Sequence, residues 1–173
     1  MAVLIVCALT GCSSRLSRLR DGLGESIPPL AERLSMLSPV VRHDEARQVA
    51  CVAMEHSIEL AQRYRVVRPP LLHNTLVNLE LKRRGLCHHW TGDLFAELRR
   101  HQFATLEIRW GLARAGTLRE HNAIVITARG EAFETGIVLD AWRHSGRVYW
   151  CDVAKDSYPW EEGEISGSTP GSP

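Results

Sequence analysis

Three residue types that cooperate in acyl transfer occur along the chain in the order Cys87, His121 and Asp140. Cys87 follows Gly85-Leu86 and precedes a stretch, 88–101, whose apolar residues mark one helical face, so it is expected at the start of a helix. Free backbone N–H groups at a helix N-terminus lower the pKa of a thiol, and they can bind the oxyanion that forms when a thiolate attacks a carbonyl. The position of Cys87 therefore indicates a nucleophile.

An expected β-hairpin brings the other two residues together. Its strands are predicted at 121–127 and 137–139, which are rich in β-branched residues. A turn centred on residues 130–131 places His121 opposite Asp140, with Cα atoms about 4.5 to 5.5 Å apart. The carboxylate would then fix one tautomer of the imidazole and leave the other ring nitrogen for a thiol. A longer turn would shift this register, and a shift by one residue would put the two side chains on opposite faces.

The elements that must position these residues follow from hydrophobic periodicity. Spacings of three and four predict helices, and alternating or β-branched runs predict strands. The helices are expected at 44–64, at 71–82 with a stop at Gly85, and at 88–101; the strands are expected at 106–112, 121–127, 137–139 and 147–153. Helices followed by strands predict an α+β fold in which N-terminal helices pack on an antiparallel sheet of three to four or more strands.

The arrangement of these motifs resembles the transglutaminase-like branch of the papain-like cysteine peptidase superfamily. Gly85-Leu86-Cys87 leads into a helix, His121 opens a strand and Leu139-Asp140 closes the next one. The resemblance covers residues 70–153. It implies a papain-like fold in which Cys87 is the nucleophile, His121 the general base and acid, and Asp140 the carboxylate that orients the imidazole.

Two departures from the family pattern place the chain in an outlying subgroup. The common His-Ala-Trp is His121-Asn122-Ala123 here, and the common Asp-Pro is Asp140-Ala141. The closest fit is to small bacterial lipoproteins of the peptidase type.

Each of the three residues also has a structural alternative. Cys87 would then be a buried structural cysteine and His121 a hydrogen-bonded histidine of the sheet. Asp140 would be a turn residue or the partner of Arg143 or Arg147 in an ion pair.

Four further residues are candidates to line a cleft beside the thiol: His88, Trp90, Asn78 and Trp142. Core packing is the alternative for the two tryptophans, and capping or packing is the alternative for Asn78. The adjacent His88 and His89 raise the question of a metal. We expect none, because consecutive residues seldom converge on one ion and no second ligand pair would complete a tetrahedron. No cofactor is expected.

The N-terminus resembles the signal of a bacterial lipoprotein. Residues 1–9 (MAVLIVCAL) form an apolar run too short to cross a bilayer. Residues 9–12 (LTGC) resemble a lipobox, which implies cleavage before Cys12 and a diacylglyceryl group on its sulfur. The alternative is a buried first strand. Ser13 resembles the pattern of lipoproteins sorted to the outer membrane, so the expected location is the cell envelope of a Gram-negative bacterium, on the periplasmic side of the outer membrane.

Composition limits the remaining possibilities. The 173 residues suffice for one domain, and 21 Lys+Arg against 20 Asp+Glu give no reason to expect a nucleic-acid partner. Five cysteines at irregular spacing predict no disulfide scaffold and permit a free thiol. The expected layout is a signal peptide at 1–11, a tether with at most one short helix at 12–39, a folded domain at 40–163 and a disordered tail at 164–173.

These patterns predict a lipid-anchored amidase, peptidase or acyltransferase that acts on protein or peptidoglycan amides through a thioester on Cys87. The first alternative is a catalytically silent fold that serves as a binding lipoprotein. The second is an acyl-CoA-dependent acetyltransferase, since arylamine N-acetyltransferases resemble this Cys, His, Asp order; an envelope location disfavours it, because acyl-CoA is cytoplasmic. The sequence does not decide between hydrolysis and transfer, and it does not reveal an oligomeric state.

Overall fold

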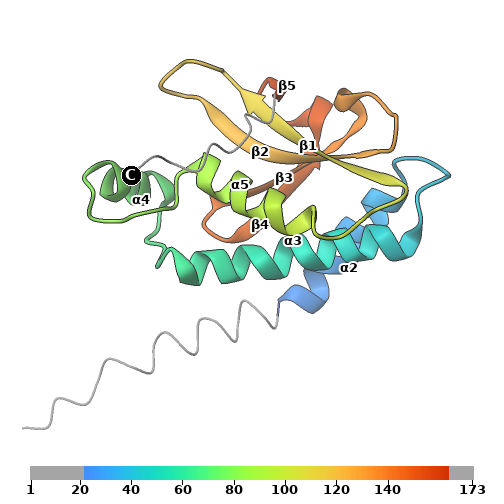
Figure 1. Cartoon of the computed structure of the whole chain (residues 1–173), viewed down its shortest axis with the longest axis horizontal. Helices are drawn as coiled ribbons and strands as arrows, with labels where there is room; N and C mark the ends of the chain where they lie inside the picture. The colour runs from blue at the N-terminus through green and yellow to red at the C-terminus, as the bar shows by residue number, and fades with distance from the viewer. Residues whose placement is uncertain (1–21, 164–173) are drawn as a thin grey trace, which may run out of the picture.

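The computed structural model describes residues 22–163, in which helices form one layer and an antiparallel sheet forms the other (Figure 1). The helices are α2 (Leu23–Ser35), α3 (His43–Arg63), α4 (Pro70–Asn78) and α5 (Cys87–Leu98). The strands are β1 (Leu106–Ala113), β2 (His121–Ala128), β3 (Ile137–His144), β4 (Arg147–Asp152) and β5 (Trp160–Gly163), with short 3-10 turns η1 (Phe133–Thr135) and η2 (Val153–Lys155). The expected α+β class is confirmed.

The sheet has the order β4-β3-β2-β1-β5, and all the pairings are antiparallel. The central strand β2 is buried along its whole length. Burial on both faces explains why residues 123–126 read as a continuous apolar run without alternation. The sequence did not predict β5, a strand of four residues that pairs with β1 at one edge.

Two apolar clusters cover the two faces of the sheet. The larger one lies between the helices and the sheet, and it includes Leu94 of α5 with Ile124 and Ile126 of β2. The smaller one gathers on the other face around Val125, Val138 and Trp160. Since side chains alternate along a strand, odd-numbered residues of β2 face the smaller cluster and even-numbered residues face the helices.

Helix α2 corrects the predicted domain boundary. Residues 12–39 were expected to form a tether with at most one short helix, yet Leu30 and Leu34 of α2 are fully buried against α3. Arg33 of the same helix also donates a 2.9 Å hydrogen bond to Asp152 at the end of β4. A prolyl pair inside the helix gave this segment the composition of a linker and hid its helical spacing. The folded unit therefore begins before residue 40.

Several predictions concern residues outside those that the structure describes. They are the signal peptide at 1–11, the lipid on Cys12, the first part of the tether and the tail at 164–173. Within residues 22–163, no helix is both long and apolar enough to cross a bilayer.

Helix α4 is shorter than predicted. The expected helix at 71–82 ends at Asn78, because Glu80 adopts a left-handed conformation with φ 59°. The N–H of Leu81 then donates to the carbonyl of Leu76 at 2.9 Å, which closes a Schellman-type helix end. Gly85 does not terminate this helix; it shapes the turn into α5.

Candidate active site

Cys87 is the first residue of α5, and the turn before it requires glycine. Gly85 has φ +129°, and a Cβ atom there would lie 2.2 Å from Nε2 of the buried His73. His73 accepts the N–H of Val67 at Nδ1 (3.1 Å), and its Nε2 lies 2.9 Å from the carbonyl oxygen of Arg84. The peptide that leads to the thiol is thus held by a core histidine that sequence reasoning did not single out.

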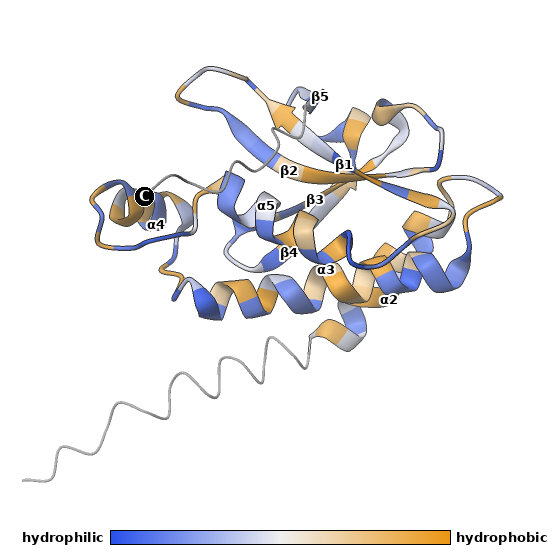
Figure 2. Ribbon diagram, viewed as in Figure 1, coloured by the Kyte–Doolittle hydropathy of each residue, from blue (hydrophilic) through white to orange (hydrophobic). Residues whose placement is uncertain are grey.

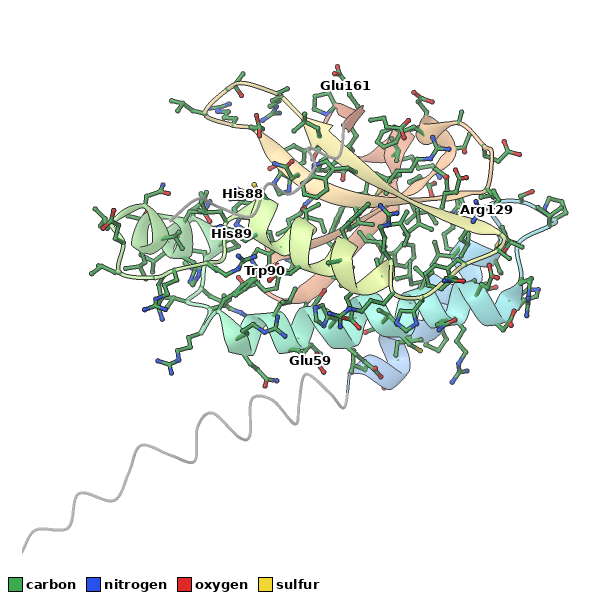
Figure 3. The ribbon with its side chains drawn as sticks, in the orientation of Figure 1. Glu59, His88, His89, Trp90, Arg129 and Glu161 are labelled. Carbon is green, nitrogen blue, oxygen red and sulfur yellow. The ribbon has the colours of Figure 1, made fainter. Side chains whose placement is uncertain are left out.

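His89 holds the same turn from inside α5. Its Nδ1 accepts hydrogen bonds from the backbone N–H groups of Gly85 and Leu86, each at 3.2 Å. His89 therefore satisfies two backbone donors just before the first residue of α5. Burial, with the nearby positive charges of His88 and Arg84, lowers the pKa of His89 to about 4, which keeps the ring neutral and able to accept at neutral pH. Figure 3 shows His88 and His89 at the start of α5, on the side of α4.

Trp90 is a core residue, which corrects its prediction as part of a cleft. Its side chain is buried at 2% exposure and meets Tyr64 edge to face, with ring centroids 5.0 Å apart. Its indole N–H donates to the carbonyl of Gly85 at 2.9 Å. Trp90 therefore supports the turn that carries Cys87 and does not face a substrate.

His121 and Asp140 form a buried hydrogen bond, with 2.6 Å between Nε2 and Oδ2. Their predicted register is wrong by two residues, because β2 pairs Ile124 with Leu139 and Val125 with Val138. The turn η1 lies in the connection between the strands and lengthens it beyond a tight hairpin. A shift of two keeps both side chains on the same face of the sheet, so the pair survives the error.

A second carboxylate and an arginine extend the pair. Asp140 also accepts the backbone N–H and the Nε–H of Arg143, both at 3.0 Å, so one of its structural alternatives, an ion pair with Arg143, coexists with the histidine contact. Arg143 then donates twice to Asp156, at 3.1 and 2.9 Å. Asp156 in turn accepts the indole N–H of Trp160 at 3.0 Å. Opposite charges alternate along this network, and every member is hydrogen-bonded.

Aromatic rings surround the imidazole of His121, whose residue is only 3% exposed. The ring centroids of Trp142, Tyr158 and Trp160 lie 4.9, 4.8 and 5.4 Å from it. Trp142 is half-buried, and its indole N–H donates to Asn74 of α4 at 3.0 Å. It therefore stands beside His121, and its role as a cleft wall stays a prediction. These rings exclude water from the histidine and fix its plane.

The thiol of Cys87 lies next to the residues at which β2 begins. Its sulfur lies 3.9 Å from the carbonyl oxygen of Glu120 and 3.9 Å from Nδ2 of Asn122. Asn122 Oδ1 accepts the indole N–H of Trp110 at 2.7 Å, which fixes the amide so that its NH2 group points to the sulfur. Sequence reasoning recorded Asn122 only as a departure from a family motif, although its place beside His121 was the available signal.

The electrostatics favour a thiolate and an imidazolium. Burial raises the pKa of Cys87, but hydrogen bonds from His121 and His88 and the charge of His121 outweigh it and lower the pKa to about 6. Burial lowers the pKa of His121, but the hydrogen bonds and negative charges of Asp140 and Cys87 raise it to about 9. The pKa of the thiol is therefore below that of the imidazole, and between these values both groups are charged.

The two remaining cleft candidates differ. His88 is exposed, and its interaction with the thiol is one of the causes that lower the pKa of Cys87. Asn78 is exposed at the end of α4 and has no hydrogen bond to any of the three central residues. Its place in a cleft stays a prediction.

Other cysteines and possible metal ligands add nothing to this site. Cys51 and Cys151 are free and half-buried in α3 and β4. In the described part of the chain, no group of three or more His, Cys, Asp and Glu side chains is arranged to hold a metal ion.

Comparisons of the chain with protein-family models, curated proteins and solved structures find no match.

Proposed function

We propose that this chain is a cysteine amidase, peptidase or acyltransferase with a transglutaminase-like fold of the papain-like type. One observation carries the proposal: the Cys87 sulfur lies 3.9 Å from the carbonyl oxygen of Glu120, the residue before His121, and a buried 2.6 Å hydrogen bond joins His121 to Asp140. These surroundings lower the pKa of the thiol to about 6. A structural cysteine needs neither a lowered pKa nor a histidine that an acid holds in place. The free thiol at a helix N-terminus, the order of the three residues along the chain and the helix-on-sheet architecture all agree with this function.

The residues can perform the reaction in two halves. In the first, the Cys87 thiolate attacks an amide carbonyl, and the backbone N–H groups of the first turn of α5 and the amide of Asn122 stabilise the oxyanion. Because Nε2 of His121 is bound to Asp140, Nδ1 is the nitrogen left to protonate the leaving amine. The C–N bond breaks, and a thioester remains on Cys87.

In the second half, His121 takes a proton from water or from a second amine, which attacks the thioester. The tetrahedral intermediate collapses and expels the Cys87 thiolate, and the imidazolium is restored. Asp140 keeps its hydrogen bond to Nε2 and stabilises the positive charge of the ring. Water gives hydrolysis, and an amine gives transfer of the acyl group.

The proposal also includes the place where the enzyme works. The lipobox-like residues 9–12 support a diacylglyceryl anchor on Cys12 and a position at the bacterial envelope, with outer-membrane sorting suggested by Ser13. The substrates would then be amides of envelope proteins or of peptidoglycan. Mass spectrometry of the mature N-terminus tests the anchor: a mature chain that starts at unmodified Met1 removes it.

The chemistry is tested first by thiol labelling. We expect iodoacetamide at a pH near 6 to alkylate Cys87 at least about tenfold faster than Cys51 or Cys151, because roughly half of Cys87 is thiolate there. Peptide mass spectrometry reads the three thiols in one sample, so Cys51 and Cys151 are internal controls. A Cys87 rate equal to theirs would favour the silent binding fold.

A pH profile sharpens the same test. Activity on amide substrates should rise as pH increases through about 6, where Cys87 loses its proton, and should fall as pH increases through about 9, where His121 loses its own. Activity that rises only near pH 9 would show a thiol without its imidazolium partner and would contradict the mechanism.

A further inference from the structure

The segment from Arg65 to Arg84, here called the α4 lobe, lies at one end of the molecule beside the start of α5 (Figure 1). Inward-facing groups attach it: His73 is buried, and Asn74 accepts the indole N–H of Trp142. Lys82 closes its base by donating to the carbonyl oxygen of Arg65 at 3.1 Å. The outer surface of the lobe is free of these attachments.

That outer surface carries exposed leucines. Leu71, Leu79 and Leu81 are 69%, 63% and 69% exposed, and Leu72 is 45% exposed. Leu72 and Leu79 are seven residues apart, which places them on one face of α4, and the helix end brings the backbone of Leu81 back to Leu76. Four of the seven exposed large apolar side chains among residues 22–163 thus gather within this short segment. Such a patch is unusual on a surface that has no partner.

Positive charge accompanies the leucines. The α4 lobe contains five basic residues and one acidic residue, Glu80, although the whole chain carries a net charge of only +1. Within residues 22–163, Arg65, Arg68 and Arg83 have no ion-pair partner, while Arg84 pairs with Asp93. In Figure 2, hydrophobic and hydrophilic ribbon alternate around this lobe. Apolar tips interleaved with free guanidinium groups are the pattern of surfaces that rest in the interface of a bilayer.

We propose that the α4 lobe binds the surface of an anionic lipid bilayer. The leucines would enter the boundary between head groups and acyl chains, and Arg65, Arg68 and Arg83 would contact lipid phosphates. The apolar side chains sit on the outside of a short helix and its exit turn, which suits insertion into a deformable interface. The positive charge of the lobe is complementary to anionic head groups.

This surface lies next to the catalytic cysteine. Only Gly85 and Leu86 separate the lobe from Cys87, and Asn74 binds the tryptophan that covers His121. A bilayer that holds the lobe would therefore hold the thiol close to the membrane surface. Binding of the lobe to a bilayer does not require catalysis, so Cys87→Ala should bind vesicles as well as the parent chain does.

The test measures co-sedimentation of the full chain with phosphatidylcholine vesicles that contain or lack phosphatidylglycerol. Cys12→Ser is present throughout, so that no attached lipid contributes. We expect phosphatidylglycerol to strengthen binding. Arg68→Glu with Arg83→Glu should weaken binding to the anionic vesicles by about 25-fold or more, since each cation contributes about fivefold near an anionic surface. Leu79→Ser with Leu81→Ser should weaken it by about tenfold for each leucine.

A matched control and a local measurement decide the outcome. Leu118→Ser with Arg119→Glu changes a fully exposed leucine and its basic neighbour in the β1–β2 connection, and should leave binding unchanged. Hydrogen exchange should slow at residues 65–84 when vesicles are added. Variants that bind like this control, or unchanged exchange in the lobe, would overturn the proposal. Sensitivity to the arginines alone, with no effect of the leucines, would point to an acidic protein partner and would also overturn it.

Discussion

Two arginines near the active site show how differently its two sides are built. Arg143 bonds to Asp140 and Asp156, whose side chains are 1% and 0% exposed, and its guanidinium lies 3.9 Å from the ring centroid of Tyr149. Arg84 bonds to Asp93 at the edge of the α4 lobe, and its side chain is 45% exposed. Arg143 and its two carboxylates are part of the interior, whereas the Arg84–Asp93 pair is in contact with water.

This difference separates the parts of the site that must be rigid from those that can meet a partner. The His121 side has its hydrogen bonds satisfied within the protein, which holds the imidazole in one orientation before any substrate arrives. The α4 lobe leaves leucines and arginines without internal partners. Internal contacts thus fix the chemistry, and the neighbouring surface remains available for docking.

The largest expected effect is the loss of Arg143. Arg143→Ala leaves two buried carboxylates without their partner and should lower the free energy of unfolding by about 3 to 5 kcal/mol. Arg84→Ala removes a surface pair and should cost less than about 1 kcal/mol. Urea unfolding measures both variants. Equal losses would show that the two arginines are not as different as their surroundings indicate.

The next effect concerns the turn that joins the lobe to α5. Gly85→Ala places a Cβ atom against the ring of His73 at a left-handed φ, and we expect a loss of about 2 to 3 kcal/mol. Gly116→Ala is the matched control, because Gly116 also has positive φ but lies in open space; about 1 kcal/mol is expected there. The same urea measurement applies, and a Gly85 loss no larger than the Gly116 loss would rule out the contact with His73.

The third effect concerns the thiol. His121→Ala removes the hydrogen bond and the positive charge that lower the pKa of Cys87, while burial remains, so the pKa should rise from about 6 to its ordinary range or above. Alkylation at a pH near 6 should slow by about tenfold or more, after allowance for the greater nucleophilicity of a more basic thiolate. The midpoint of the rate against pH measures the shift. An unchanged midpoint would mean that His121 does not act on the sulfur.

The smallest effect is expected on the surface of the lobe. Leu79→Ser with Leu81→Ser should change the free energy of unfolding by no more than about 0.5 kcal/mol, because both side chains already contact water. Thermal unfolding checks this value. A large loss would place the leucines in the folded core and would weaken the contrast between the two sides of the site.

Much of the fold follows from local patterns in the sequence. Helix α3 was predicted within one residue at each end, and four of the five strands were predicted from their β-branched or alternating residues. Cys87 was selected for its place at the start of a predicted helix, and His121 and Asp140 were selected because they face each other across a predicted hairpin. Their order along the chain was enough to suggest the chemistry.

The rest depends on contacts between distant residues. The register between β2 and β3 changed by two because η1 takes up part of the connection, and no local pattern measures that length in space. Arg143 was considered only as a competing partner of Asp140, whereas it joins that carboxylate to Asp156. The composition of residues 12–39 predicted a tether, because the contacts that bury α2 come from α3 and β4, which are distant in the sequence.

The indole rings of Trp90 and Trp142 also show that sequence position alone does not predict which side chains line the site. Trp90 and Trp142 both lie close in the sequence to a residue of the proposed triad, and both were expected in the cleft. Only the packing distinguishes them, since Trp90 points into the core beside Tyr64 and Trp142 covers the imidazole. Residue type and sequence position cannot tell a supporting ring from a ring that faces substrate.

The neutral ring of His89 makes the turn that carries Cys87 sensitive to acid. In the unfolded chain this imidazole binds a proton near its ordinary pKa of 6.5, whereas in the folded chain it resists protonation until about pH 4. The unfolded state therefore takes up more protons between these values, so stability falls as pH decreases from about 6.5 and is lost most fully below about 4. Protonation would also remove the acceptor for Gly85 and Leu86. Protonation of His89 in acid would thus release the peptide that leads to Cys87. This effect would not depend on the charge of the sulfur.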